Sequence, residues 1–136
     1  MKDDIIFNKL NTIERCIVRI NEVYEGDERN LEDFTKQDSI ILNLQRACEA
    51  SIDLSMHIIA VKRLGIPQNS RDAFEILHVN AIISSSTMEM LKRMVGFRNI
   101  AVYDYQSIQL EILKAIIDKH LGDFKQFSKE ISKLLQ

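Results

Sequence analysis

The spacing of apolar residues is the feature that most constrains how this chain folds. From Ile6 to Tyr24 the apolar residues recur at intervals of four and three, which places them on one stripe of an amphipathic helix. The same alternation returns between Leu113 and Leu134. The 136 residues include only 4 Gly and 1 Pro, with no Asn-Gly turn, so little interrupts the helices. The pattern therefore predicts an all-α domain.

The apolar stripes and the breaks between them indicate an up-down bundle of about five helices. The second helix is the longest and is apolar on more than one face, which predicts burial on several sides or a face shared with a partner subunit. The polar stretch 26–34 is expected to be a loop, and Pro67 prevents the second helix from continuing. The helices are expected at 4–24, 36–64, 70–80, 86–103 and from about 107 to the C-terminus, with N-caps at Asp3 or Asp4, Thr35, Ser70 and Ser86.

Length and composition exclude several classes of protein. A chain of this size predicts a single domain over 1–136. No apolar run approaches the roughly 18 residues of a membrane helix, and the first residues lack a signal-peptide pattern. Cys16 and Cys48 match no metal spacing and suit a reducing compartment, so we expect a cytoplasmic protein without membrane, metal or cofactor. The net charge of −2 argues against non-specific coating of nucleic acid but allows a local basic patch.

The stretch 94–105, Met-Val-Gly-Phe-Arg-Asn-Ile-Ala-Val-Tyr-Asp-Tyr, does not fit a plain packing pattern. Arg98 supplies a rigid, permanently charged fork suited to phosphate. On a continuous helix Tyr103 lies next to the face of Arg98 and Tyr105 lies about two turns from Arg98, so a guanidinium and a phenol can converge on one patch. Composition alone also allows another interpretation, in which Arg98, Tyr103 and Tyr105 pack a dimer seam.

Other polar residues offer weaker signals for a functional site. His57 and His78 follow no metal spacing, and His120 falls on the apolar stripe of the last helix, where we expect it to be packed. No Gly-rich phosphate loop and no Ser-His-Asp arrangement is present. Arg46 and Glu49 interrupt the apolar second helix and are expected to be ordinary surface charges.

The stretch 94–105 resembles the HEPN superfamily and, within it, the HepT-like proteins of bacterial toxin–antitoxin pairs. The family motif is Arg, a polar residue, three further residues, His, any residue and Tyr. Arg98, Asn99, Asp104 and Tyr105 occupy the matching positions, and Tyr103 occupies the histidine position. The resemblance covers most of the chain, with further similar segments at 44–54, 57–60, 65–67, 70–74 and 94–99.

The resemblance implies a HEPN-like bundle that forms a homodimer with a cleft between its subunits. It also implies metal-independent cleavage of RNA by a nuclease toxin. Arg98 would stabilise the charged phosphoryl transition state, with Asn99 and Tyr103 in the other catalytic positions. The resemblance further implies that a nucleotidyltransferase antitoxin neutralises the toxin by adding adenylyl groups to the motif tyrosine, Tyr105.

The tyrosine in the histidine position leaves more than one function open. A phenol has an ordinary pKa of about 10, so it is a poor general base at neutral pH. It still donates hydrogen bonds to phosphate or stacks on bases. The first hypothesis is therefore a HepT-like ribonuclease toxin. The second is a catalytically impaired HEPN-like protein that binds RNA, nucleotide or a nucleotidyltransferase without cleaving RNA. The third is a plain structural dimerisation module.

Overall fold

The computed structural model describes residues 3–136, and all the regular structure in that range is helical. The prediction of an all-α fold with five helices is confirmed. No helix within the described range is both long and apolar enough to cross a membrane. The α-helices are α1 (Asp4–Tyr24), α2 (Phe34–Lys62), α3 (Ser70–Val79), α4 (Ser85–Tyr103) and α5 (Leu110–Ser132), and short 3-10 turns form η1 (Glu28–Glu32), η2 (Tyr105–Ser107) and η3 (Lys133–Leu135).

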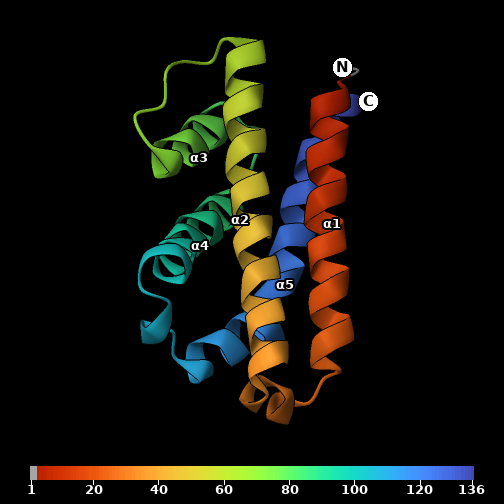
Figure 1. Ribbon diagram of the computed structural model, residues 1–136. Coiled ribbons are helices and arrows are strands. Elements are labelled where there is room, and N and C mark those ends of the chain that lie inside the picture. The colour runs from red at the N-terminus through yellow and green to blue at the C-terminus, as the bar shows by residue number, and fades with distance from the viewer. Residues whose placement is uncertain (1–2) are drawn as a thin grey trace.

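Helix α2 lies at the centre of the bundle (Figure 1). It runs antiparallel to α1 and packs against α1 on one side and against α3 and α4 on another. Helix α5 completes the bundle by contacting both α1 and α4. The expected burial of α2 on several sides is therefore confirmed, and its fully buried residues include Ile40, Leu44, Leu54 and Ile58.

The apolar stripe of α1 faces the core, as its spacing predicts. Ile6, Ile13, Ile17, Ile20 and Tyr24 are all buried. Burying one such aliphatic side chain contributes roughly 1.5–3 kcal/mol, so a stripe of this kind supplies much of the energy that fixes α1 on the bundle.

The predicted N-caps differ from the observed ones at three helices. The correct cap lies one or two residues earlier in each case, because a short polar side chain there reaches a backbone N–H three residues on. Several residues that can act as N-caps lie close together at each of these helix starts, so the sequence alone does not show which one is the cap. Asp3 caps α1 as expected, whereas Asp33 replaces Thr35 at α2, Asn69 replaces Ser70 at α3 and Ser84 replaces Ser86 at α4.

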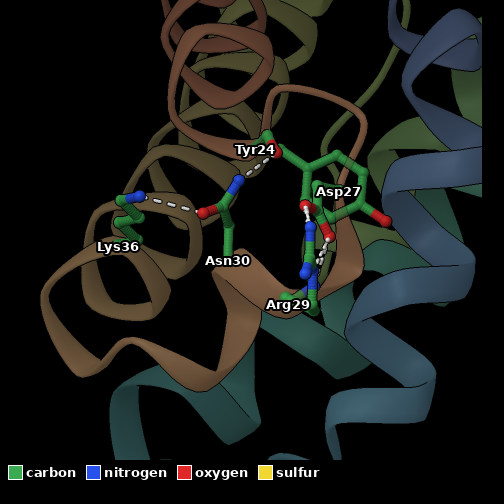
Figure 2. Close-up of polar contacts among 5 residues, drawn as sticks. All are labelled: Tyr24, Asp27, Arg29, Asn30 and Lys36. Carbon is green, nitrogen blue, oxygen red and sulfur yellow. Dashed lines mark hydrogen bonds and ion pairs between the residues drawn. The ribbon is translucent and has the colours of Figure 1, made fainter.

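The connection between α1 and α2, expected to be a loop, contains η1 and is braced by side chains (Figure 2). Asn30 Nδ2 donates to the Tyr24 carbonyl oxygen at 2.7 Å, and Lys36 Nζ donates to Asn30 Oδ1 at 2.9 Å. The Arg29 guanidinium donates to Asp27 and lowers the pKa of that carboxyl to about 2. These contacts fix the position at which α2 begins.

Helix α4 ends at Tyr103, in agreement with the break predicted at 104–106. Asp104 leaves helical geometry with φ −152° and ψ 54°. Its carboxylate accepts a hydrogen bond of 2.6 Å from Ser107 Oγ, and its backbone carbonyl accepts one of 2.9 Å from the Ser107 N–H. Tyr105 therefore lies on the short turn η2 and not on the helix that carries Arg98.

A buried carboxylate holds the other end of α4. Glu130 of α5 accepts hydrogen bonds of 2.6 Å from the Ser84 backbone N–H and from Thr87 Oγ1. The carboxylate occupies the N-terminus of α4, where exposed N–H groups and the helix dipole favour an anion. Glu130 thus joins α4 to α5 and sets the direction in which α4 carries its C-terminal residues.

We expect Glu130→Ala to lower the free energy of unfolding by about 2–3 kcal/mol, because it leaves the Ser84 backbone N–H and the buried Thr87 hydroxyl without this acceptor. Urea denaturation followed by circular dichroism measures the change. Lys129→Ala, at an exposed neighbouring position, is the control and should change stability by less than about 0.5 kcal/mol. Equal losses in the two variants would contradict the role assigned to Glu130.

Candidate functional site

A row of polar side chains on α2 faces the end of α4 and the turn that follows it. Asp38, Gln45 and Glu49 are separated by seven and four residues, which places them within about 40° of one another around the helix axis. Glu49 contacts Arg98 of α4, and Asp38 contacts Tyr105 of η2. The two ends of the 98–105 segment therefore both contact this row.

The Arg98 guanidinium is held by two side chains. Its Nη2 lies 3.3 Å from Glu49 Oε2, and its Nη1 donates to Asn99 Oδ1 at 3.1 Å. Gln45 Nε2 donates to the other Glu49 oxygen at 3.2 Å and steadies that carboxylate. The Arg98 side chain remains 27% exposed, and its buried Nε has no hydrogen-bond partner among residues 3–136. Arg98 is thus oriented by the protein and still open to an anion.

The expectation that Glu49 is an ordinary surface charge beside Arg46 is wrong. Arg46 is exposed, whereas Glu49 is half-buried and paired with Arg98. The contact of Glu49 with Arg98 joins α2 to a residue 49 positions away, a separation that local spacing cannot reveal. Asp38 and Gln45 were not predicted as site residues either, although their common face with Glu49 was readable from the sequence.

The two tyrosines of the segment have different surroundings. Tyr103 ends α4, is 78% exposed and makes no hydrogen bond through its hydroxyl within the described chain. Tyr105 is 40% exposed, and its hydroxyl donates to the Asp38 carboxylate. Burial, and then the hydrogen bond and charge of Asp38, raise the pKa of Tyr105 well above the ordinary value for a phenol.

Arg98 and Tyr105 do not form the single patch expected from a continuous helix. The helix ends at Tyr103, so the two-turn relationship between Arg98 and Tyr105 is lost. Their partners on α2, Glu49 and Asp38, lie three turns apart, roughly 16 Å along the axis. The segment therefore makes two separate polar contacts along one face of α2.

Each of the three histidines has a hydrogen-bond partner away from Arg98, so none of them belongs to the Arg98 site. His57 Nε2 lies 2.6 Å from Asp3 Oδ2, and His78 Nδ1 lies 3.1 Å from the Ile83 carbonyl oxygen. His120 is not packed as expected: its side chain is 38% exposed, and its Nδ1 lies 2.9 Å from Asp123 Oδ2. In the part of the chain that the structure describes, no three metal-ligating side chains lie together.

Apolar side chains surround the 98–105 segment at the surface. A groove of about 420 Å³ between α4 and α5 is lined mainly by apolar residues, among them Phe97, Ile100 and Ile112. Ile100 and Ile112, which line the groove, are 41% and 52% exposed, and Val102 and Leu110, near them in the sequence, are exposed as well. An exposed apolar groove of this kind is typical of a site of contact with another molecule.

The comparisons with known proteins identify the family. The model of the ribonuclease HepT-like family matches residues 13–131. This chain belongs to the ribonuclease HepT-like family. It is 53% identical over 125 residues to the mRNA nuclease HepT of Shewanella oneidensis, covering 92% of this chain and 94% of that protein.

Solved structures agree with the HepT-like assignment. The fold matches the tri-AMPylated Shewanella oneidensis HEPN toxin in complex with its MNT antitoxin, with a TM-score of 0.91 and 52% identity over 97% of this chain and 99% of that one. A toxin–antitoxin structure with AMP-PNP also matches with a TM-score of 0.91 and 52% identity, over 96% of this chain and 99% of that one.

Proposed function

We propose that this HepT-like chain is a metal-independent ribonuclease toxin that acts as a single domain, 1–136, in the cytoplasm. Arg98 is its phosphate-binding residue, with Asn99 and Tyr103 beside it in the catalytic site. The observation that carries this proposal is the Arg98 guanidinium, oriented by Glu49 and Asn99 and still accessible. The 53% identity to an mRNA nuclease supports RNA as the substrate.

The ion pair between Arg98 and Glu49 is suited to exchange with a phosphate. Both side chains are partly exposed, and exposed ion pairs contribute only about 0–1 kcal/mol. An RNA phosphate accepts two parallel hydrogen bonds from the guanidinium fork, so it competes well with Glu49. As cleavage proceeds, Arg98 stabilises the negative charge that develops on the phosphoryl oxygens.

Tyr103 supplies a hydrogen-bond donor in place of the family's histidine. Its exposed hydroxyl follows Arg98 by little more than one turn at the end of α4. A phenol at neutral pH donates a proton more readily than it accepts one. Tyr103 therefore serves to hold the phosphate or the leaving oxygen and not to act as the general base.

The same HepT-like chain is the target of a nucleotidyltransferase antitoxin in this proposal. Tyr105 occupies the motif tyrosine position, and its hydroxyl lies at the surface. The 52%-identical toxin of Shewanella oneidensis is tri-AMPylated and bound to an MNT antitoxin. Tyr105 is accordingly the acceptor of adenylyl groups from such a partner.

A second copy of the chain completes the cleft at the apolar surface around the groove between α4 and α5. We expect Ile112→Asp to convert a dimer into a folded monomer, because Ile112 is 52% exposed and its burial is needed only between copies. Sedimentation velocity measures the change. Val79→Asp, at an exposed apolar residue of α3, is the control and should remain dimeric. A wild-type protein that sediments as a monomer would contradict the homodimer.

RNA cleavage by the purified chain in EDTA tests the nuclease activity. We expect Arg98→Ala to reduce the rate by about 100- to 1,000-fold, the usual effect of removing one group that stabilises transition-state charge. Arg46→Ala removes an exposed arginine of α2 outside the site and should cleave as the wild type does. Equal rates for Arg98→Ala and the wild type would contradict the assignment of Arg98.

Tyr103→His in the same assay distinguishes the two functions that Tyr103 leaves open. Higher cleavage in this variant than in an active wild type would mean that histidine improves a working site. Cleavage by Tyr103→His alone would favour the second candidate, a binding protein with an intact cleft and a disabled proton-transfer position. The observation that favours this second candidate is the exposed phenol of Tyr103 at the histidine position.

A further inference from the structure

The contact between Tyr105 and Asp38 joins two segments that are 67 residues apart. Tyr105 opens the turn η2, which Asp104 and Ser107 stabilise, and Asp38 lies one turn into α2. The start of α2 is itself fixed by the braced connection that contains Asn30 and Lys36 (Figure 2). The phenol and the carboxylate are therefore brought together by two ordered elements.

We propose that Asp38 is a catalytic residue for modification of Tyr105, where it receives the phenolic proton during transfer of the adenylyl group. This inference rests on the proposed role of Tyr105 as acceptor. A weak hydroxyl nucleophile requires an adjacent base within hydrogen-bond reach, and Asp38 holds that position.

Tyr105 Oη attacks the α-phosphorus of the nucleoside triphosphate held by the partner, and an Oη–P bond forms. The bond from that phosphorus to the bridging oxygen breaks, and pyrophosphate leaves with the electron pair. The phenolic proton passes to Asp38, which is exposed and returns it to water.

The state of the Tyr105 hydroxyl explains why the base is needed. Burial and the Asp38 carboxylate raise the pKa of Tyr105, so at neutral pH the hydroxyl is protonated and donates to Asp38. The proton must leave while the bond to phosphorus forms, and a carboxylate already bonded to it gives the shortest path. Tyr103 makes no such contact in the described chain, so the geometry selects Tyr105 between the two tyrosines.

The chain contains a second tyrosine–aspartate hydrogen bond that serves as a control. Tyr24 Oη donates to Asp118 Oδ1 at 3.2 Å, but Tyr24 is only 5% exposed and cannot enter another protein's active site. Asp118→Asn therefore removes a tyrosine–aspartate contact of the same chemistry without affecting an acceptor. It is the control for Asp38→Asn.

The experiment follows transfer of labelled AMP from ATP to the full chain, catalysed by the MNT antitoxin of the Shewanella oneidensis complex. We expect Asp38→Asn to lower kcat by on the order of 100-fold with little change in KM for the chain, and Asp38→Glu to restore part of the rate. Asp118→Asn should match the wild type. Mass spectrometry should locate the label on Tyr105 and not on Tyr103.

An ultraviolet titration of the tyrosines tests the contact itself without the partner. We expect the pKa of Tyr105 to fall in Asp38→Asn, because a neutral amide removes the negative charge beside the phenol, whereas burial continues to hold that pKa above its ordinary value. Subtracting the Tyr105→Phe titration assigns the signal. An unchanged pKa of Tyr105 would overturn the contact and the proposal built on it.

The outcomes separate failure of this inference from failure of the proposed function. Label absent from the wild type, or retained in full by Tyr105→Phe, would overturn Tyr105 as acceptor and with it the role of Asp38. Label that depends on Tyr105, with Asp38→Asn reacting as fast as the wild type, would overturn the role of Asp38 alone. A faster reaction in Asp38→Asn would also overturn it, because Asp38 would then restrain the hydroxyl.

Discussion

The burial of α2 on several sides is the constraint on which the rest of the structure depends. Its apolar faces pack against α1, α3 and α4, so the helix cannot rotate without exposing part of the core. The polar row from Asp38 to Glu49 is therefore fixed in direction. Glu130, buried between α4 and α5, fixes the opposite end of α4. Together these contacts bring the 98–105 segment to the polar row.

The segment divides into two parts with different chemistry. Arg98 is joined to Glu49 by a partly exposed ion pair, which a phosphate can replace at small cost. Tyr105 is joined to Asp38 by a hydrogen bond that leaves its oxygen at the surface. The break after Tyr103 separates these contacts along α2. In the proposed function RNA cleavage depends on Arg98, whereas modification by a partner depends on Tyr105 and Asp38, so substitutions can affect one and spare the other.

The helices could be predicted from the sequence because their apolar stripes and the breaks between them are local patterns. Examples are the stripe from Ile6 to Tyr24, which forms α1, and the break after Tyr103, where α4 ends. The family resemblance located Arg98 and Tyr105. Their partners were not predicted, because Glu49 and Asp38 are 49 and 67 residues away, and only the packing of α4 on α2 brings them together. The partial exposure of His120 was not predicted either, since an apolar stripe does not show how fully neighbouring helices cover each position.

We propose that Arg98 is the residue at which RNA phosphate binds. The most direct measurement is a ¹⁵N NMR titration of the Arg98 Nε–H signal with an uncleavable 2′-O-methyl RNA, using Arg98→Lys to assign the signal. Nε is buried without a partner among the described residues, so its resonance reports a new acceptor at the guanidinium. We expect this signal to shift and to saturate as the RNA is added. An unchanged Arg98 signal, while other residues shift to saturation, would contradict it.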